Sequence, residues 1–86
     1  MGAVEQAKSL VGQLLKQSEG RVQALENAIK SLEEMRDQLT STFRGTASDT
    51  GKTAASALEA SITEIKKAAQ AVERSKSELA KCQSSL

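Results

Sequence analysis

Apolar residues recur at helical spacing through two long segments, residues 3–42 and 47–84, and predict two helices. In the first segment, one seven-residue series forms a row and the positions three residues further on form another. The first row reads Val4, Val11, Ser18, Leu25, Leu32 and Leu39, and the second reads Ala7, Leu14, Arg21, Ala28, Met35 and Thr42. These rows predict a heptad seam with a weak patch at its centre, where Ser18 and Arg21 fall.

Further apolar residues widen the stripe of the first helix: Leu10, Leu15, Val22, Ala24, Ile29 and Phe43. Because this stripe is broader than one facing helix can cover, we expect the first helix to contact more than one neighbour. Gly12 and Gly20 each disfavour a helix interior by about 1 kcal/mol. The seven-residue phase nevertheless continues across Gly20, which predicts one continuous helix, with a kink near Gly20 as the alternative.

The second segment has a cleaner but slimmer apolar row. Its main series is Leu58, Ile65, Val72, Leu79 and Leu86, with Ile62 and Ala69 at the intermediate positions. Lys76 and Gln83 interrupt the row toward its end. Many alanines in the early and middle turns would let another helix approach closely.

The two main rows lie at equal distances on either side of Gly45. Folding the chain about Gly45 sets Leu32 opposite Leu58 and Leu25 opposite Ile65. The sequence therefore predicts an all-α fold of one domain, an antiparallel two-helix hairpin with helices at about 3–42 and 47–84 and a turn at about 43–46. At 1.5 Å per residue its arms are about 55–60 Å long. Because so small a core stabilises a chain by only about 3–5 kcal/mol, we expect a partner to complete a four-helix or larger bundle.

The start of the second helix has competing signals. Thr46 followed by Asp49 fits a cap whose hydroxyl accepts a free backbone N–H, with the carboxylate in the first turn, whereas Ser48 and Thr50 are alternative starts. Gly51-Lys52-Thr53 after Gly45 looks like a phosphate-binding loop, but five residues intervene where that loop has four. A polar helix start explains the stretch better.

Composition argues against several classes of function. Lys and Arg number 12 against 11 Asp and Glu, too small an excess for a protein that follows nucleic-acid phosphates. Without histidine, Cys82 has no partner for nucleophilic or zinc chemistry and is expected to pack inertly, so we expect no enzyme activity, metal or cofactor. The line formed by Lys67, Arg74 and Lys81 alternates with glutamates and predicts a solvated surface. No apolar run is long enough to enter a membrane as a span.

The bend carries the only aromatic residue of the chain, in the tripeptide Phe43-Arg44-Gly45. A short helical hairpin with an aromatic-x-Gly at its bend resembles the WXG (ESAT-type) superfamily of bacterial type VII secretion. Phe in place of Trp is similar to the FxG branch, the small targeting proteins that accompany LXG-domain toxins. The resemblance covers the whole chain in length and architecture, and Phe43 and Gly45 in identity. The C-terminal Tyr-x-x-x-Asp/Glu export signal of many WXG substrates is absent, because the chain has no Tyr.

The resemblance implies a targeting or chaperone-like partner that binds the helical LXG domain of a toxin, alone or with a second small helical protein. Phe43 and Gly45 would then form a tip motif that contributes to a composite export signal read by the secretion machinery. It implies a cytoplasmic protein, or one exported with its partner by a Sec-independent route, since the first residues also lack the pattern of a cleaved signal peptide.

Two alternatives stay open at this point. The chain could be a self-associating secreted WXG-type substrate that forms a homodimer, or an antiparallel coiled-coil module unrelated to secretion. All three hypotheses use an apolar face for helix-on-helix recognition. The predicted partner-binding face comprises Leu10, Val11, Leu14, Leu15, Val22, Leu25, Ile29, Leu32, Met35, Leu58, Ile62, Ile65, Val72 and Leu79.

Overall fold

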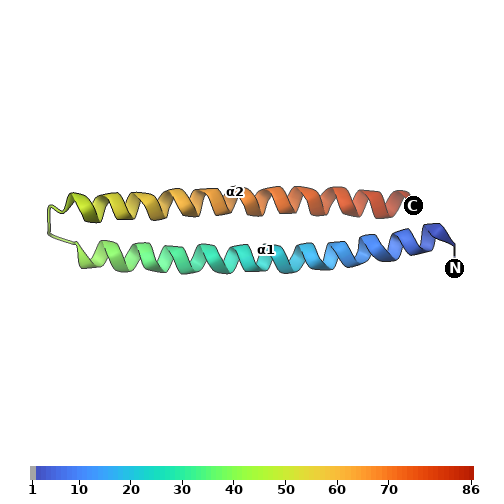
Figure 1. The fold of residues 1–86 in the computed structure, drawn as a ribbon, viewed down its shortest axis with the longest axis horizontal. Helices are drawn as coiled ribbons and strands as arrows, with labels where there is room; N and C mark the ends of the chain where they lie inside the picture. The colour runs from blue at the N-terminus through green and yellow to red at the C-terminus, as the bar shows by residue number, and fades with distance from the viewer. Residues whose placement is uncertain (1) are drawn as a thin grey trace.

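The computed structural model describes residues 2–86 and contains two helices, α1 (Ala3–Thr42) and α2 (Asp49–Ser85). They pack side by side in opposite directions, with the bend at one end and both termini at the other (Figure 1). The hairpin measures 67 × 14 × 13 Å. The predicted all-α antiparallel hairpin is confirmed.

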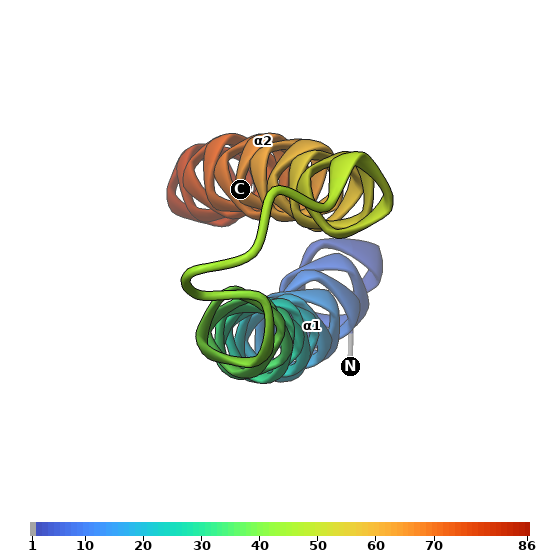
Figure 2. The same ribbon diagram turned by 90° about the vertical axis from the view of Figure 1, so that its left-hand side faces the viewer.

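Helix α1 runs without interruption through Gly12 and Gly20, as the continuous heptad phase predicts. Nothing lies within 4 Å of the position that a Cβ at Gly20 would take, so no packing contact requires a glycine there. Viewed from the bend, the two helices are inclined to each other and are not aligned along one direction (Figure 2). This inclination is what a heptad seam requires, because side chains at a 3.5-residue spacing drift around a straight helix.

Most of the buried and half-buried positions follow alternating steps of three and four residues along both helices, and we call the positions of these series the seam. Five further half-buried positions lie beside it: Ala7, Gly12, Ala28, Glu33 and Ala54. On α1 they are Val11, Leu15, Ser18, Val22, Leu25, Ile29, Leu32, Arg36 and Leu39. On α2 they are Gly51, Ala55, Leu58, Ile62, Ile65, Ala69, Val72, Lys76, Leu79 and Gln83. The first predicted row of α1 is therefore correct from Val11 to Leu39, whereas its first member, Val4, is exposed. The second row is wrong at Leu14, Arg21, Met35 and Thr42, which are exposed, and the seam instead passes through Leu15, Val22, Ile29 and Arg36.

The register of the two helices also differs from a fold about Gly45. That fold would set Phe43 opposite residue 47 and Arg36 opposite residue 54. Instead, the Phe43 ring lies against Gly51, and Arg36 forms an ion pair with Glu59. The pairing is displaced by about one helical turn along α2. The linker extends over residues 43–48 and α2 begins at Asp49, two residues later than expected, which accounts for about half of this displacement.

The hairpin has very little interior. Val22 at 8% exposure and Ile62 at 2% are the buried apolar side chains among the residues described. A compact protein of 9.1 kDa has an accessible surface of about 4,900 Å², whereas this chain exposes 6168 Å². The excess of about 1,300 Å² exceeds the roughly 800 Å² that one protein contributes to a standard interface. An isolated hairpin therefore leaves enough surface uncovered to accommodate a partner.

Candidate functional site

Phe43 stands at the end of α1 and packs across the bend onto the first turn of α2. A Cβ placed on Gly51 would lie 2.7 Å from Phe43 Cγ and 3.0 Å from both Cδ atoms, closer than real contacts allow. Gly51 is therefore the seat of the ring, and a larger residue there would push the ring away. The ring is still 36% exposed, so it closes the end of the hairpin and remains accessible to another molecule.

Gly45 supplies the backbone conformation that the bend requires. Its φ of +81° lies in the left-handed region that residues with a Cβ rarely adopt. The Thr46 N–H donates to the carbonyl of Phe43 at 3.1 Å, and the Thr46 hydroxyl donates to the same oxygen at 2.7 Å. Two hydrogen bonds to one carbonyl close the turn and hold Phe43 in position. Phe43 and Gly45 thus belong to one ordered structure.

Ser48 caps α2, one of the alternative starts that the sequence left open beside Thr46. The Ser48 hydroxyl accepts a hydrogen bond from the Gly51 N–H at 3.1 Å, while the Thr46 hydroxyl is engaged in closing the turn. Asp49 lies in the first turn, where a negative charge complements the helix dipole. Because the Gly51 N–H is bonded to Ser48 and its Cα face is covered by Phe43, this stretch does not form an open phosphate cradle.

A mostly apolar hollow of about 210 Å³ opens beside Phe43 at the tip. Leu39 and Phe43 line it from α1 and the linker, and Gly51 and Ala55 line it from α2. Arg44 and Lys52 also line it. The hollow thus combines an apolar interior with two cationic side chains, and no acidic residue lines it.

Arg36 occupies a seam position that the sequence analysis did not single out. Its guanidinium donates to Glu59 on α2 at 2.5 Å and to Asp37 at 3.1 Å. The hydrogen bond to Glu59 raises the pKa of Arg36, with a smaller contribution from Asp37. The four-residue step from Leu32 marks Arg36 as a seam residue, but the assumed three-residue step placed Met35 there instead.

The predicted partner-binding face is divided between two locations. Eleven of its members are seam residues: Val11, Leu15, Val22, Leu25, Ile29, Leu32, Leu58, Ile62, Ile65, Val72 and Leu79. The other three, which we call the α1 flank, are Leu10, Leu14 and Met35, with exposures of 60%, 46% and 49%. The α1 flank therefore lies outside the hairpin and is open to a partner. Most seam residues are only half-buried, so their edges are also accessible.

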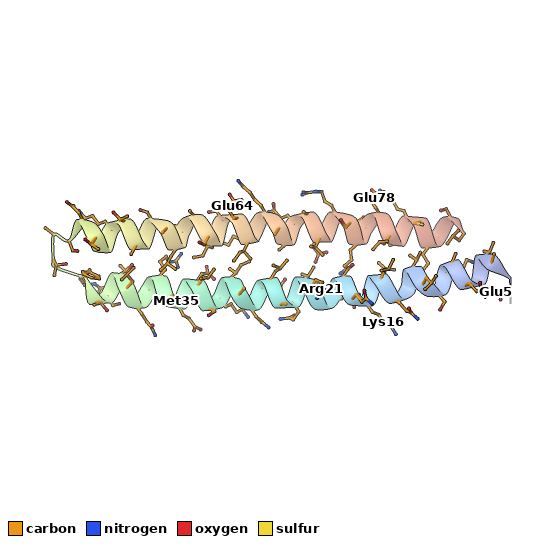
Figure 3. All side chains as sticks on the ribbon, in the orientation of Figure 1. Glu5, Lys16, Arg21, Met35, Glu64 and Glu78 are labelled. Atoms are coloured by element: carbon orange, nitrogen blue, oxygen red, sulfur yellow. The ribbon has the colours of Figure 1, made fainter. Side chains whose placement is uncertain are left out.

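The outer surface of α2 is charged, with lysines and glutamates in pairs. Lys67 lies 3.5 Å from Glu64, and Lys81 lies 3.3 Å from Glu78, which confirms the expected alternation of charges on α2. Glu64 and Glu78 lie on the side of α2 that faces away from α1 (Figure 3). Cys82 is exposed and does not pack on the apolar face as expected, because the seam passes through Gln83 beside it.

Metal-binding clusters and membrane-spanning segments are other features that can carry a function. Over residues 2–86, no group of three or more Cys, Asp and Glu residues comes together as a metal site would require. Within the same residues, neither helix has an apolar stretch long enough to cross a membrane. Comparisons with known protein families, with curated proteins and with solved structures find no match to this chain. The tip and the α1 flank are therefore the surfaces on which a function can be argued.

Proposed function

We propose that this protein is a non-enzymatic targeting partner of type VII secretion, which binds the helical domain of an LXG toxin and presents Phe43 and Gly45 as part of an export signal. The observation that carries the proposal is the fixed and partly exposed position of Phe43. An aromatic side chain is held at the extreme end of a long hairpin by a glycine seat and an ordered turn, with part of the ring exposed. Such a position suits a residue that another protein reads.

The surface of the hairpin supports the toxin-binding part of the proposal. The α1 flank offers a helical partner exposed apolar side chains at two places on α1, Leu10 and Leu14 near its start and Met35 near its end. Covering apolar surface stabilises a complex by about 25 cal/mol for each Å², before the costs of association. A helical domain packed on the α1 flank would complete a four-helix or larger bundle, which is the arrangement that covers the excess surface of two-helix hairpins.

The proposal is tested by Phe43→Ala in a bacterium that exports the toxin. Export should fall to background, while helicity by circular dichroism and binding to the LXG domain are retained. Leu86→Ala is the matched control, because Leu86 is exposed to a similar degree at 40% but lies at the other end of the hairpin. Phe43→Leu, which keeps an apolar group on Gly51, separates loss of the aromatic ring from loss of packing. If Phe43→Ala only unfolds the protein, or exports normally, the tip is not a signal.

A second candidate function is a secreted substrate that associates with itself, because the α1 flank could equally be covered by another copy of this chain. Sedimentation equilibrium at micromolar concentration distinguishes the two. A stable homodimer that Leu14→Glu dissociates supports the self-associating substrate. A monomer that dimerises only with the LXG domain supports the targeting partner.

A further inference from the structure

The hollow at the tip has an apolar interior whose polar atoms are already satisfied. The Thr40 hydroxyl donates to the Arg36 carbonyl at 2.9 Å, and the Thr46 hydroxyl donates to the Phe43 carbonyl. The Ser48 hydroxyl accepts from the Gly51 N–H. Each hydroxyl group around the hollow is therefore engaged within the tip, and the surface offered to a ligand is mainly that of Leu39, Phe43 and Ala55.

The two cationic residues of the hollow are not engaged in this way. Among residues 2–86, the ion pairs involve Arg36, Lys67, Lys76 and Lys81, and neither Arg44 nor Lys52 takes part in one. Arg44 precedes Gly45 in the turn, and Lys52 follows Gly51 in the first turn of α2, so the two charges come from opposite sides of the bend. A ligand that enters the hollow therefore meets two positive charges that have no carboxylate partner.

We propose that the tip hollow binds one apolar side chain carried by an acidic segment of another protein, with carboxylates of that segment contacting Arg44 and Lys52. The inference rests on the proposed role of the tip and specifies the chemistry of what the tip recognises. The apolar side chain would pack against the Phe43 ring, so the ring would act as one wall of the binding site. Gly51 would act as a positioning residue, because it determines where that wall stands.

The size of the hollow favours a protein segment over a lipid. Its volume of about 210 Å³ is confined to the end of the hairpin, whereas an acyl chain needs a long continuous groove. Phe43 is the only aromatic residue of the chain, so the tip lacks the cluster of aromatic side chains typical of surfaces that enter a bilayer. Charge complementarity and the space for one side chain both suit a short acidic motif.

The test is an NMR titration of the full isotope-labelled chain with a synthetic acidic peptide that carries one leucine between glutamates. We expect saturable shifts of backbone amides confined to residues 39–55. Replacing the leucine with serine, or the glutamates with glutamines, should weaken binding about tenfold or more, since about 1.4 kcal/mol corresponds to tenfold in affinity. Vesicles of phosphatidylglycerol should bind no better than the peptide with serine.

Variants locate the site on the protein. The double variant Arg44→Glu with Lys52→Glu should weaken binding of the acidic peptide about tenfold or more. Two glutamates beside the hollow would repel the carboxylates of the peptide that the two cations attract. Lys67→Glu with Lys81→Glu makes the same change of charge on the outer surface of α2 and should leave binding unchanged. Phe43→Leu keeps an apolar wall and should retain part of the affinity if Phe43 acts by contact.

Several outcomes would overturn the inference: no binding at millimolar peptide, equal binding of the peptide with serine, equal loss with both pairs of charge reversals, or tighter binding to the vesicles. These results are separate from the export experiment. A peptide that fails to bind while Phe43→Ala still blocks export rejects the acidic motif and leaves the export signal intact. Peptide binding with normal export of Phe43→Ala rejects the signal and leaves the binding site.

Discussion

The half of the hairpin next to the bend and the half next to the termini differ in their packing, although the same seam runs through both. Near the bend, Ile62 is almost fully buried and Phe43 packs closely on Gly51. Near the termini, the seam includes Lys76 and Gln83, and Val4 is 52% exposed. Apolar contacts thus close the hairpin at the bend, whereas polar seam residues and an exposed valine lie toward its other end.

The terminal half combines apolar seam residues, Val11, Leu15, Val22, Val72 and Leu79, with polar contacts. The Gln83 amide donates to the Lys8 carbonyl at 3.1 Å and comes within 3.2 Å of the position that a Cβ on Gly12 would take. Exposed hydrogen bonds of this kind contribute little net stability, because water competes for the same groups. The bend half contains the most buried side chain, Ile62, and the close contact of Phe43 with Gly51, so we expect it to contribute more stability than the terminal half.

The largest expected effect comes from truncating the buried side chain of the bend half. Ile62→Ala should lower the free energy of unfolding by about 3 kcal/mol, the range of large-to-small substitutions at buried sites. Leu79→Ala, at a half-buried seam position of the terminal half, should cost about 1 kcal/mol. Chemical denaturation followed by circular dichroism measures both. Equal losses would mean that the two halves contribute alike.

A smaller effect is expected from adding a side chain at Gly51, where the Phe43 ring packs. Gly51→Ala should destabilise the hairpin by about 1–2 kcal/mol, because the added methyl group overlaps the ring and must displace it. Gly20→Ala is the matched control: its Cβ would meet open space, so it should stabilise α1 by about 1 kcal/mol through helix propensity alone. Thermal melts of the two variants should therefore shift in opposite directions. A higher melting temperature for Gly51→Ala would contradict the close packing of the Phe43 ring on Gly51.

The terminal half can be made more like the bend half by removing a charge from its seam. Lys76→Leu should stabilise the hairpin by about 1 kcal/mol, because an apolar side chain replaces an ammonium group at a half-buried position. Amide hydrogen exchange should slow over residues 8–18 and 76–86. Lys67→Leu, on the exposed outer surface, should change neither quantity. If both variants behave alike, the seam does not pass through Lys76.

The smallest effect is expected at the ion pair between the helices. Arg36→Gln should lower the melting temperature slightly at low ionic strength, and the difference from the parent should shrink as salt is added. Because the hydrogen bond to Glu59 raises the pKa of Arg36, the contribution linked to the Arg36 charge is fully present at neutral pH and is lost only as the pH rises through that raised pKa. Arg36 itself should therefore produce no pH dependence of the melting temperature around neutrality.

Much of the fold follows from the spacing of apolar residues. The bounds of α1 were predictable because its apolar stripe ends at Phe43 and Gly45 follows in a conformation that only glycine adopts readily. The second row of α1 was predicted wrongly, because both Leu14 and Leu15 are leucines and either can continue a heptad pattern. Only the packing against α2 shows that Leu15 lies in the seam and Leu14 outside it.

The candidate site was only partly visible in the sequence. Phe43 and Gly45 stand out because each is unusual where it occurs, but Gly51 drew notice only through its likeness to part of a phosphate-binding loop. Its role depends on a contact with Phe43 across the bend, and nothing in the local sequence encodes that contact. Arg36 was missed for a similar reason: its partner, Glu59, lies on the other helix.

The sequence by itself determined that this chain forms two long helices joined near Gly45, because helical periodicity and glycine conformation are local properties. The tertiary structure decided which apolar row faces inward, where Arg36 and Phe43 find their contacts, and that the helices are displaced by about one turn from symmetry about Gly45. Those features depend on the length of the linker and on the fit of side chains between two helices. A heptad pattern allows several registers, and packing selects one of them.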